Sequence, residues 1–145
     1  MYPIPVAKVA EALGGERALG GPVRDLGELA AAVACGLPRG VVREVAANAA
    51  PAGGEARSRV AALVVSPATY KRGERLSPAA SERAERLARV AALARQALGD
   101  ADAARTWLTE PHPMLGGPPI ELAATDLGAR QVERLLLNIE HGLPA

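Results

Sequence analysis

The chain has 145 residues, and 49% of them are hydrophobic, yet it contains no Phe, one Trp and two Tyr. Its formal net charge of +1 is too small to indicate nucleic-acid binding by itself. Because its apolar residues are mostly Ala, Leu and Val, which bury little area each, we expect partner surfaces to add to the stability of a monomer. Good helix formers are abundant and no segment alternates with a period of two, which predicts an all-α fold.

Several classes of site and protein are excluded by composition. Cys35 is the only cysteine, so no internal disulfide can form, and its Ala and Val neighbours predict a buried core thiol. One cysteine and two distant histidines make no zinc site, and no metal or cofactor is expected. No nucleophile accompanies either histidine, and no phosphate loop follows Gly14-Gly15, so the chain is not expected to be an enzyme. Without a membrane-length apolar run or a signal peptide, we expect a cytoplasmic protein with no membrane partner.

The first third of the chain predicts short helices separated by Gly and Pro. These are Val6–Leu13, a helix from its cap Asp25 to Cys35, and a helix from Pro38 to about Ala50. Pro51-Ala52-Gly53-Gly54 then breaks the chain.

Two further short helices follow this break, and the second one is basic. Ala56–Val64 is the first, and the cap Ser66 with Pro67 starts a second helix that ends at Gly73. Residues 57–75 carry five basic side chains and one acidic one, whereas the segments on both sides are mildly acidic. This pattern is typical of a helix-turn-helix, and the candidate DNA contacts are Ser66, Thr69, Lys71, Arg72 and Arg75. The alternative is a solvated basic turn without a ligand.

The longest predicted helix begins after the cap Ser77 and runs from Pro78 to Leu98. Its apolar positions alternate in spacings of four and three, which places them on one helical face: Ala80, Ala84, Leu87, Ala91, Ala94 and Leu98. So wide an apolar face predicts that this helix is central to the fold.

A short helix with Trp107 follows the cap Asp100 and leads into a rigid loop, Pro111–Pro119. The loop presents Met114 and Leu115 on a backbone that proline has stiffened, which favours partner binding because little entropy remains to be lost. The alternative is a connector whose Leu115 and Ile120 fill the core.

The last predicted helix ends near Glu140-His141-Gly142, and one of its leucines does not fit its apolar stripe. Its inward positions are Gly128, Val132, Leu135, Leu136 and Ile139. Leu137 falls on the opposite side, beside Arg130, Arg134 and His141, which predicts either an isolated exposed leucine or a partner contact.

This order of parts resembles the C-terminal toxin-binding domain of the Xre/MbcA/ParS-type antitoxins, small bacterial proteins that pair with toxins of the RES class. The matching positions are Trp107, Pro113, Leu115, Gly116, Gly117, Ile120 and Gly142. Residues 25–38 and 57–75 match the Xre-like helix-turn-helix part of the family more loosely. The resemblance implies an N-terminal helical region with this motif, residues 1–75, and a toxin-binding domain, residues 76–145, which share the long central helix.

The resemblance also implies a function: a type II antitoxin that neutralises a RES-type, NAD-consuming toxin by obstructing its active site. The residues expected to contact the toxin are Met114, Leu115, Arg130, Arg134, Leu137, His141, Leu143, Pro144 and Ala145. The family further implies a homodimer within a hetero-oligomer, which binds its own operator DNA. The alternative is a dimeric helix-turn-helix repressor with no toxin partner, whose C-terminal part only dimerises.

Overall fold

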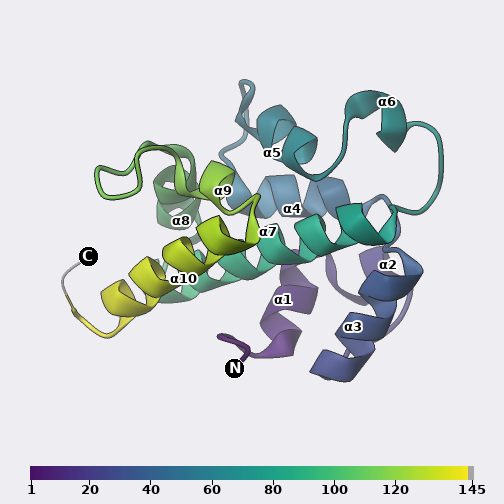
Figure 1. Cartoon of the computed structure of the whole chain (residues 1–145), viewed down its shortest axis with the longest axis horizontal. Helices are drawn as coiled ribbons and strands as arrows, with labels where there is room; N and C mark the ends of the chain where they lie inside the picture. The colour runs from purple at the N-terminus through teal and green to yellow at the C-terminus, as the bar shows by residue number, and fades with distance from the viewer. Residues whose placement is uncertain (144–145) are drawn as a thin grey trace.

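The structure is a computed structural model, and it describes residues 1–143. This part of the chain folds into ten helices with no β-strand, which confirms the all-α class (Figure 1). The helices are α1 (Val6–Ala12), α2 (Gly15–Leu19), α3 (Leu26–Cys35), α4 (Val41–Ala49), α5 (Ala56–Val64), α6 (Pro67–Tyr70), α7 (Pro78–Leu98), α8 (Ala101–Thr109), α9 (Pro119–Leu122) and α10 (Asp126–Glu140).

The helix starts are made by the side chains that the sequence indicates. In each predicted cap, a side-chain oxygen accepts a hydrogen bond of 2.8–3.2 Å from the backbone N–H three residues later. These caps are Asp25 for α3, Ser66 for α6, Ser77 for α7 and Asp100 for α8. Pro67 and Pro78 occupy the first helical positions, where a missing N–H costs nothing.

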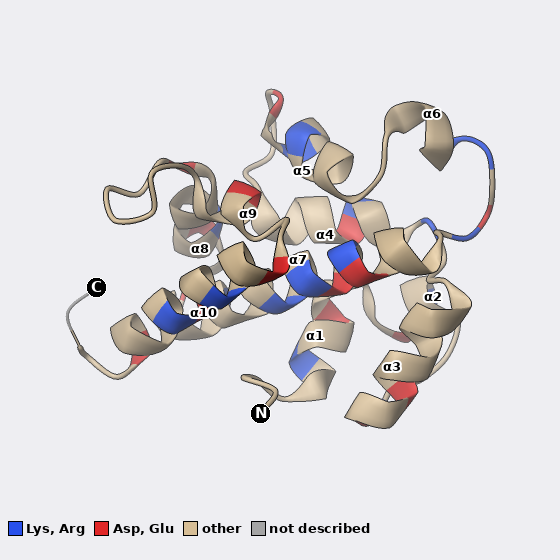
Figure 2. Ribbon diagram, viewed as in Figure 1, with Lys and Arg blue, Asp and Glu red and all other residues tan. Residues whose placement is uncertain are grey.

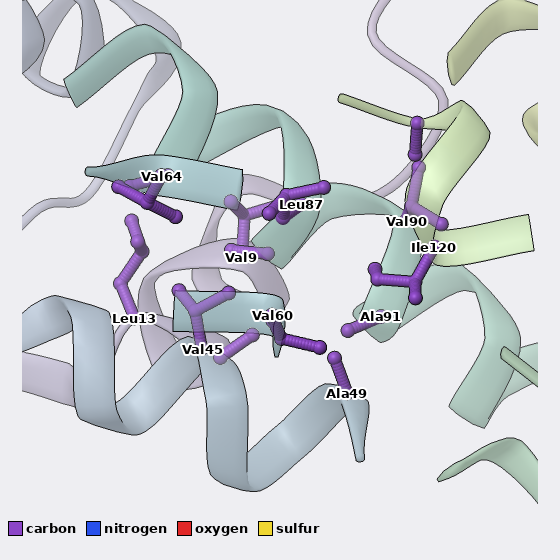
Figure 3. Close-up of a cluster of buried hydrophobic side chains, with 14 of the residues drawn as sticks. Val9, Leu13, Val45, Ala49, Val60, Val64, Leu87, Val90, Ala91 and Ile120 are labelled. Carbon is purple, nitrogen blue, oxygen red and sulfur yellow. The ribbon is translucent and has the colours of Figure 1, made fainter. Parts of the chain in front are cut away.

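Helix α7 is the centre of the fold, as its wide apolar face predicts. It packs against α1, α3, α4, α5, α8, α9 and α10. The predicted stripe is buried from Ala80 to Ala94, and Leu98 at its end is half-buried. Figure 3 shows the centre of this core, where α7 meets side chains of four other helices: Val9, Val45, Val60 and Ile120.

Helix α10 runs parallel to the C-terminal half of α7 (Figure 1). Three polar contacts, two to α10 itself and one to a residue two positions before its start, occur in the same order along both segments and fix this register. They join Arg86 to the Ala124 carbonyl, Arg89 to Glu133 and Gln96 to Glu140. Because Val132 and Leu136 of α10 are fully buried in the same cluster as the α7 stripe, the two predicted units share one core. Their boundary at residue 75 stays a prediction.

Two expectations about the N-terminal half are wrong. Helix α6 ends at Tyr70 and not at Gly73, because the next residues leave the helix to pair with another segment: the Leu76 N–H donates to the Leu37 carbonyl at 2.8 Å. Cys35 is exposed and not buried, because α3 turns Leu29 inward and leaves Cys35 on its outer side. The sequence analysis also missed α2 and α9, which have five and four residues and are too short to show a helical period.

Candidate functional site

The predicted DNA-contacting residues lie in and directly after α6. Ser66, Thr69, Lys71, Arg72 and Arg75 are all exposed. Figure 2 shows the basic residues of the loop that follows α6, with Glu74 between them. The helix pair α5–α6 with its tight turn thus presents short polar and long cationic side chains at one surface.

A residue that the sequence analysis missed holds this surface in place. Arg39 donates from one terminal nitrogen to the carbonyls of Tyr70 and Gly73, at 3.2 and 3.3 Å. Its guanidinium carbon also lies 5.3 Å from the centre of the Tyr70 ring, a cation–π distance. Arg39 therefore fixes both ends of the turn that carries Lys71 and Arg72. The only sequence signal was its position after a Leu-Pro pair, and nothing local pointed to α6.

Three of the five candidates, Ser66, Thr69 and Arg75, are engaged within the protein. The Ser66 hydroxyl accepts from the Thr69 N–H and donates to the Thr69 hydroxyl at 2.9 Å. Arg75 donates from one terminal nitrogen to the Gly36 carbonyl at 2.9 Å. By contrast, the side chains of Lys71 and Arg72 make no hydrogen bond or ion pair with any residue in the described range, so both are available to a partner.

The loop between α8 and α9 is held closed by His112, which the sequence analysis dismissed. Its carbonyl accepts from the N–H groups of Leu115 and Gly116 at 3.0 and 3.1 Å, and its own N–H donates to the Gly117 carbonyl. The His112 Nδ1 accepts from the Met114 N–H at 3.1 Å, and its ring meets the Trp107 ring edge-on at 5.8 Å. A histidine two residues before a predicted exposed methionine was the available signal.

This closed loop separates its two apolar residues. Met114 stands at the tip with 67% of its surface exposed. Leu115 is half-buried and packs against the hydrophobic core, as does the fully buried Ile120 just after the loop. The loop therefore combines both readings of the sequence: Met114 is presented outward, while Leu115 and Ile120 anchor it.

The outer side of α10 carries the other candidates, and Arg130, Arg134 and His141 are exposed. The expectation that Leu137 is exposed there is wrong: it is half-buried and packed against the core, because its place on the flank of the helix lets its side chain bend toward the buried stripe. The exposed leucine of this face is Leu127, at 76% exposure, which the sequence analysis missed. Its spacing of seven residues before Arg134 would have placed it on the same face.

Helix α10 ends in a compact turn. Gly142 adopts a positive φ of 71°, and the Leu143 N–H donates back to the Asn138 carbonyl at 2.8 Å, which is the pattern of a Schellman cap. Leu143 is 56% exposed after this turn. Pro144 and Ala145, the last two predicted toxin contacts, lie outside the described residues.

The candidate surfaces lie at opposite ends of the long axis of the molecule (Figure 1). The loop after α8 and the C-terminal end of α10 lie at one end, and α6 with its basic loop lies at the other. Residues 1–143 contain no group of three or more side chains that could hold a metal, and no helix of this stretch is long and apolar enough to cross a bilayer.

Two known domain families match parts of the chain. Residues 93–142 match the antitoxin Xre/MbcA/ParS C-terminal toxin-binding domain, and residues 28–89 match the antitoxin Xre-like helix-turn-helix domain. The chain belongs to the Xre/MbcA/ParS-type antitoxins. No curated protein matches it. The toxin-binding match contains the His112 loop and all of α10, and the helix-turn-helix match contains α6 and Arg39.

The antitoxin has an ion cluster that joins Tyr2, in the N-terminal arm before α1, to α7 and α10. Arg89 of α7 bonds to Glu133 of α10 and, at 3.0 Å, to Glu85, and all three side chains are at most 16% exposed. The Tyr2 hydroxyl donates to Glu85 at 2.7 Å, and its ring lies under the Arg89 guanidinium. Burial opposes the charge of Arg89, but Glu85 and Glu133 outweigh it and raise the pKa of Arg89, so this guanidinium stays charged.

Proposed function

We propose that this antitoxin neutralises a RES-type toxin through the loop between α8 and α9 and the outer side of α10. The observation that supports this proposal is a pair of exposed apolar side chains, Met114 and Leu127, which both lie within the matched toxin-binding domain. Large apolar residues on a stiff loop and on a helix face are suited to a partner surface, because they lose little conformational freedom on binding. Arg130, Arg134 and His141 make the rest of this face polar and basic.

The proposed mode of neutralisation is steric. The end of α10 and the turn at Leu143 project from the same end of the molecule as the Met114 loop, so a toxin seated there would have this terminus at its surface (Figure 1). We infer that the terminus obstructs the entrance to the toxin's active site. A non-catalytic role is supported by the two matched families, which are described by toxin binding and by a helix-turn-helix.

The second part of the proposal is binding of operator DNA by a homodimer. Lys71 and Arg72 are the cations of the helix-turn-helix surface whose side chains make no bond within residues 1–143, and so few charges per chain give only weak, salt-sensitive binding. A dimer that places two copies on one duplex would multiply this affinity. Because the toxin and DNA surfaces lie at opposite ends, both partners can be held together (Figure 1).

The test of the toxin proposal is a pull-down from the native host with the tagged chain, read by mass spectrometry. Wild type is expected to recover a RES-type toxin in a fixed ratio, and Met114→Asp with Leu127→Glu is expected to lose it. The matched control is Leu26→Glu, since Leu26 is also an exposed leucine in the first turn of a helix, α3. Recovery of only the antitoxin itself and DNA would favour the repressor alternative.

The test of the DNA proposal is retardation of the antitoxin's own promoter fragment, with the mass in solution measured by light scattering. Lys71→Gln with Arg72→Gln is expected to abolish retardation without changing the dimer mass or the thermal stability. This pair is preferable to a variant at Arg75, whose bond to the Gly36 carbonyl would be lost with its charge. If the double variant retards the promoter fragment as strongly as wild type does, Lys71 and Arg72 are not DNA contacts.

A further inference from the structure

A hollow of about 270 Å³ lies between α6, the basic loop and the first turn of α7. Three arginines from three separate segments line it: Arg39, Arg75 and Arg83. The hydroxyl-bearing residues in its wall are Ser66, Thr69, Tyr70 and Ser77, and no carboxylate side chain lines it. The sequence alone does not bring these groups together, because Arg39 precedes Arg83 by more than 40 positions.

Each arginine is positioned by the backbone and not by an acid. Arg39 bonds to the carbonyls of Tyr70 and Gly73, Arg75 bonds to that of Gly36, and Arg83 donates from Nε to that of Val64 at 2.9 Å. None of the three forms an ion pair with any residue among 1–143. A guanidinium has five N–H donors, so each arginine keeps free donors and its full charge.

Such a wall is suited to one kind of ligand. Three ordered, unneutralised guanidinium groups with neighbouring hydroxyls match the oxygens of a phosphate group, whereas a cation would meet only repulsion. Ordering the side chains costs little on binding, because the carbonyl bonds already hold them. Ser66 and Thr69 also belong to the candidate DNA surface, so a phosphate in the hollow would lie directly beside α6.

We propose that this hollow is a phosphate-binding site which, in the complex with operator DNA, receives a backbone phosphate next to the segment inserted by the helix-turn-helix. The assignment to DNA rests on the proposed operator binding, but the site itself does not. A free phosphate or a mononucleotide would offer the same chemistry.

The experiment uses the full chain and two probes. The first probe is inorganic phosphate, titrated at constant ionic strength against chloride and followed by backbone amide NMR shifts. The second is a labelled promoter duplex, with the dissociation constant measured by fluorescence anisotropy over a range of salt concentrations.

The variant is Arg83→Gln, whose amide can still donate to the Val64 carbonyl, and Arg83→Lys restores the charge. The matched control is Arg95→Gln, an exposed arginine on the same helix that has no ion pair within residues 1–143.

We expect phosphate to shift amides at Thr69, Gly73 and Ser77 in wild type and in Arg95→Gln but not in Arg83→Gln. Loss of one charged phosphate contact should weaken duplex binding on the order of tenfold. The slope of log K against log salt should fall by about one, and Arg83→Lys should recover most of both.

The outcomes separate the site from the DNA proposal. Phosphate shifts without any duplex binding by wild type would support the site, assign it to free phosphate and refute operator binding. Duplex binding that weakens in Arg83→Gln without free-phosphate shifts would assign the site to the DNA backbone. Equal duplex affinity and slope in Arg83→Gln, or absence of both responses in wild type, would overturn the proposal. If Arg83→Gln lowers the melting temperature by more than a few degrees, Arg75→Gln replaces it under the same criteria, with its own melting temperature checked because its bond to the Gly36 carbonyl is also lost.

Discussion

Replacement of Arg89 by methionine gives the sharpest test of how Tyr2 and α10 are held against α7. Arg89→Met keeps an unbranched apolar stem but removes the charged end, which leaves Glu85 and Glu133 without their shared partner at side-chain exposures of 16% and 14%. Breaking a fully buried pair from one side costs about 3–5 kcal/mol. Because these carboxylates keep some contact with water, we expect about 2–4 kcal/mol of lost unfolding free energy.

Removal of one acidic partner of Arg89 should lower the free energy of unfolding much less. Glu133→Gln leaves Arg89 with Glu85 as its partner and with a neutral acceptor in place of the second carboxylate, so we expect about 1 kcal/mol. Glu85→Gln together with Glu133→Gln should rescue much of the Arg89→Met loss, because no unpaired charge then remains. The cost therefore depends on whether a substitution leaves an unpaired charge.

The assay is urea unfolding at pH 7, followed by circular dichroism, with the slope of the transition checked for every variant. A single transition is expected, since the described helices share one core. An Arg89→Met loss no larger than that of Glu133→Gln, or no rescue in the triple variant, would refute the electrostatic account and leave Arg89 as a packing residue.

Three other predictions concern stability. Gly128→Ala should cost about 3 kcal/mol in urea unfolding, because a Cβ there would lie 1.8 Å from the Leu122 carbonyl oxygen, and full stability would refute this close approach. Ser81→Ala should cost about 1–3 kcal/mol in the same assay, because it leaves the Leu37 N–H without its 2.8 Å acceptor. Burial, then the nearby carboxylate, raises the pKa of Tyr2 above its ordinary value of about 10, so its contribution to stability is complete below that pH and falls as pH rises above it. Tyr2→Phe should remove this extra loss above about pH 10 in thermal melts.

Local chemistry explains what the sequence predicted well. A cap such as Asp25 or Ser77 acts within three residues, and the stripe along Pro78–Leu98 is a property of one helix. Both signals are complete in a short window, so the starts of four helices and the central position of α7 could be predicted without the structure.

What could not be predicted depends on contacts between distant segments. Arg39 reaches α6 from a position 31 residues before Tyr70, and no local pattern encodes that pairing. The exposure of Cys35 depends on which side of α3 faces the core. Because α3 is nearly all apolar, its sequence does not indicate which side that is. The predicted exposure of Leu137 was wrong for a related reason. Its angle around the helix was correct, but this angle fixes the direction of Cβ and not where the rest of a leucine side chain lies.

The N-terminal residues show why the family boundaries are not the boundaries of the fold. Residues 1–27 lie outside both matched domains. Yet Ile4, Val9 and Leu13 are buried in the common core, α1 packs on α4 and α7, and Tyr2 closes the ion cluster against α7. Removing this segment would uncover the apolar faces of both helices and expose Arg89 and its carboxylates to water. The N-terminal arm is therefore part of the scaffold that holds α10, and with it the toxin-binding face, in position against α7.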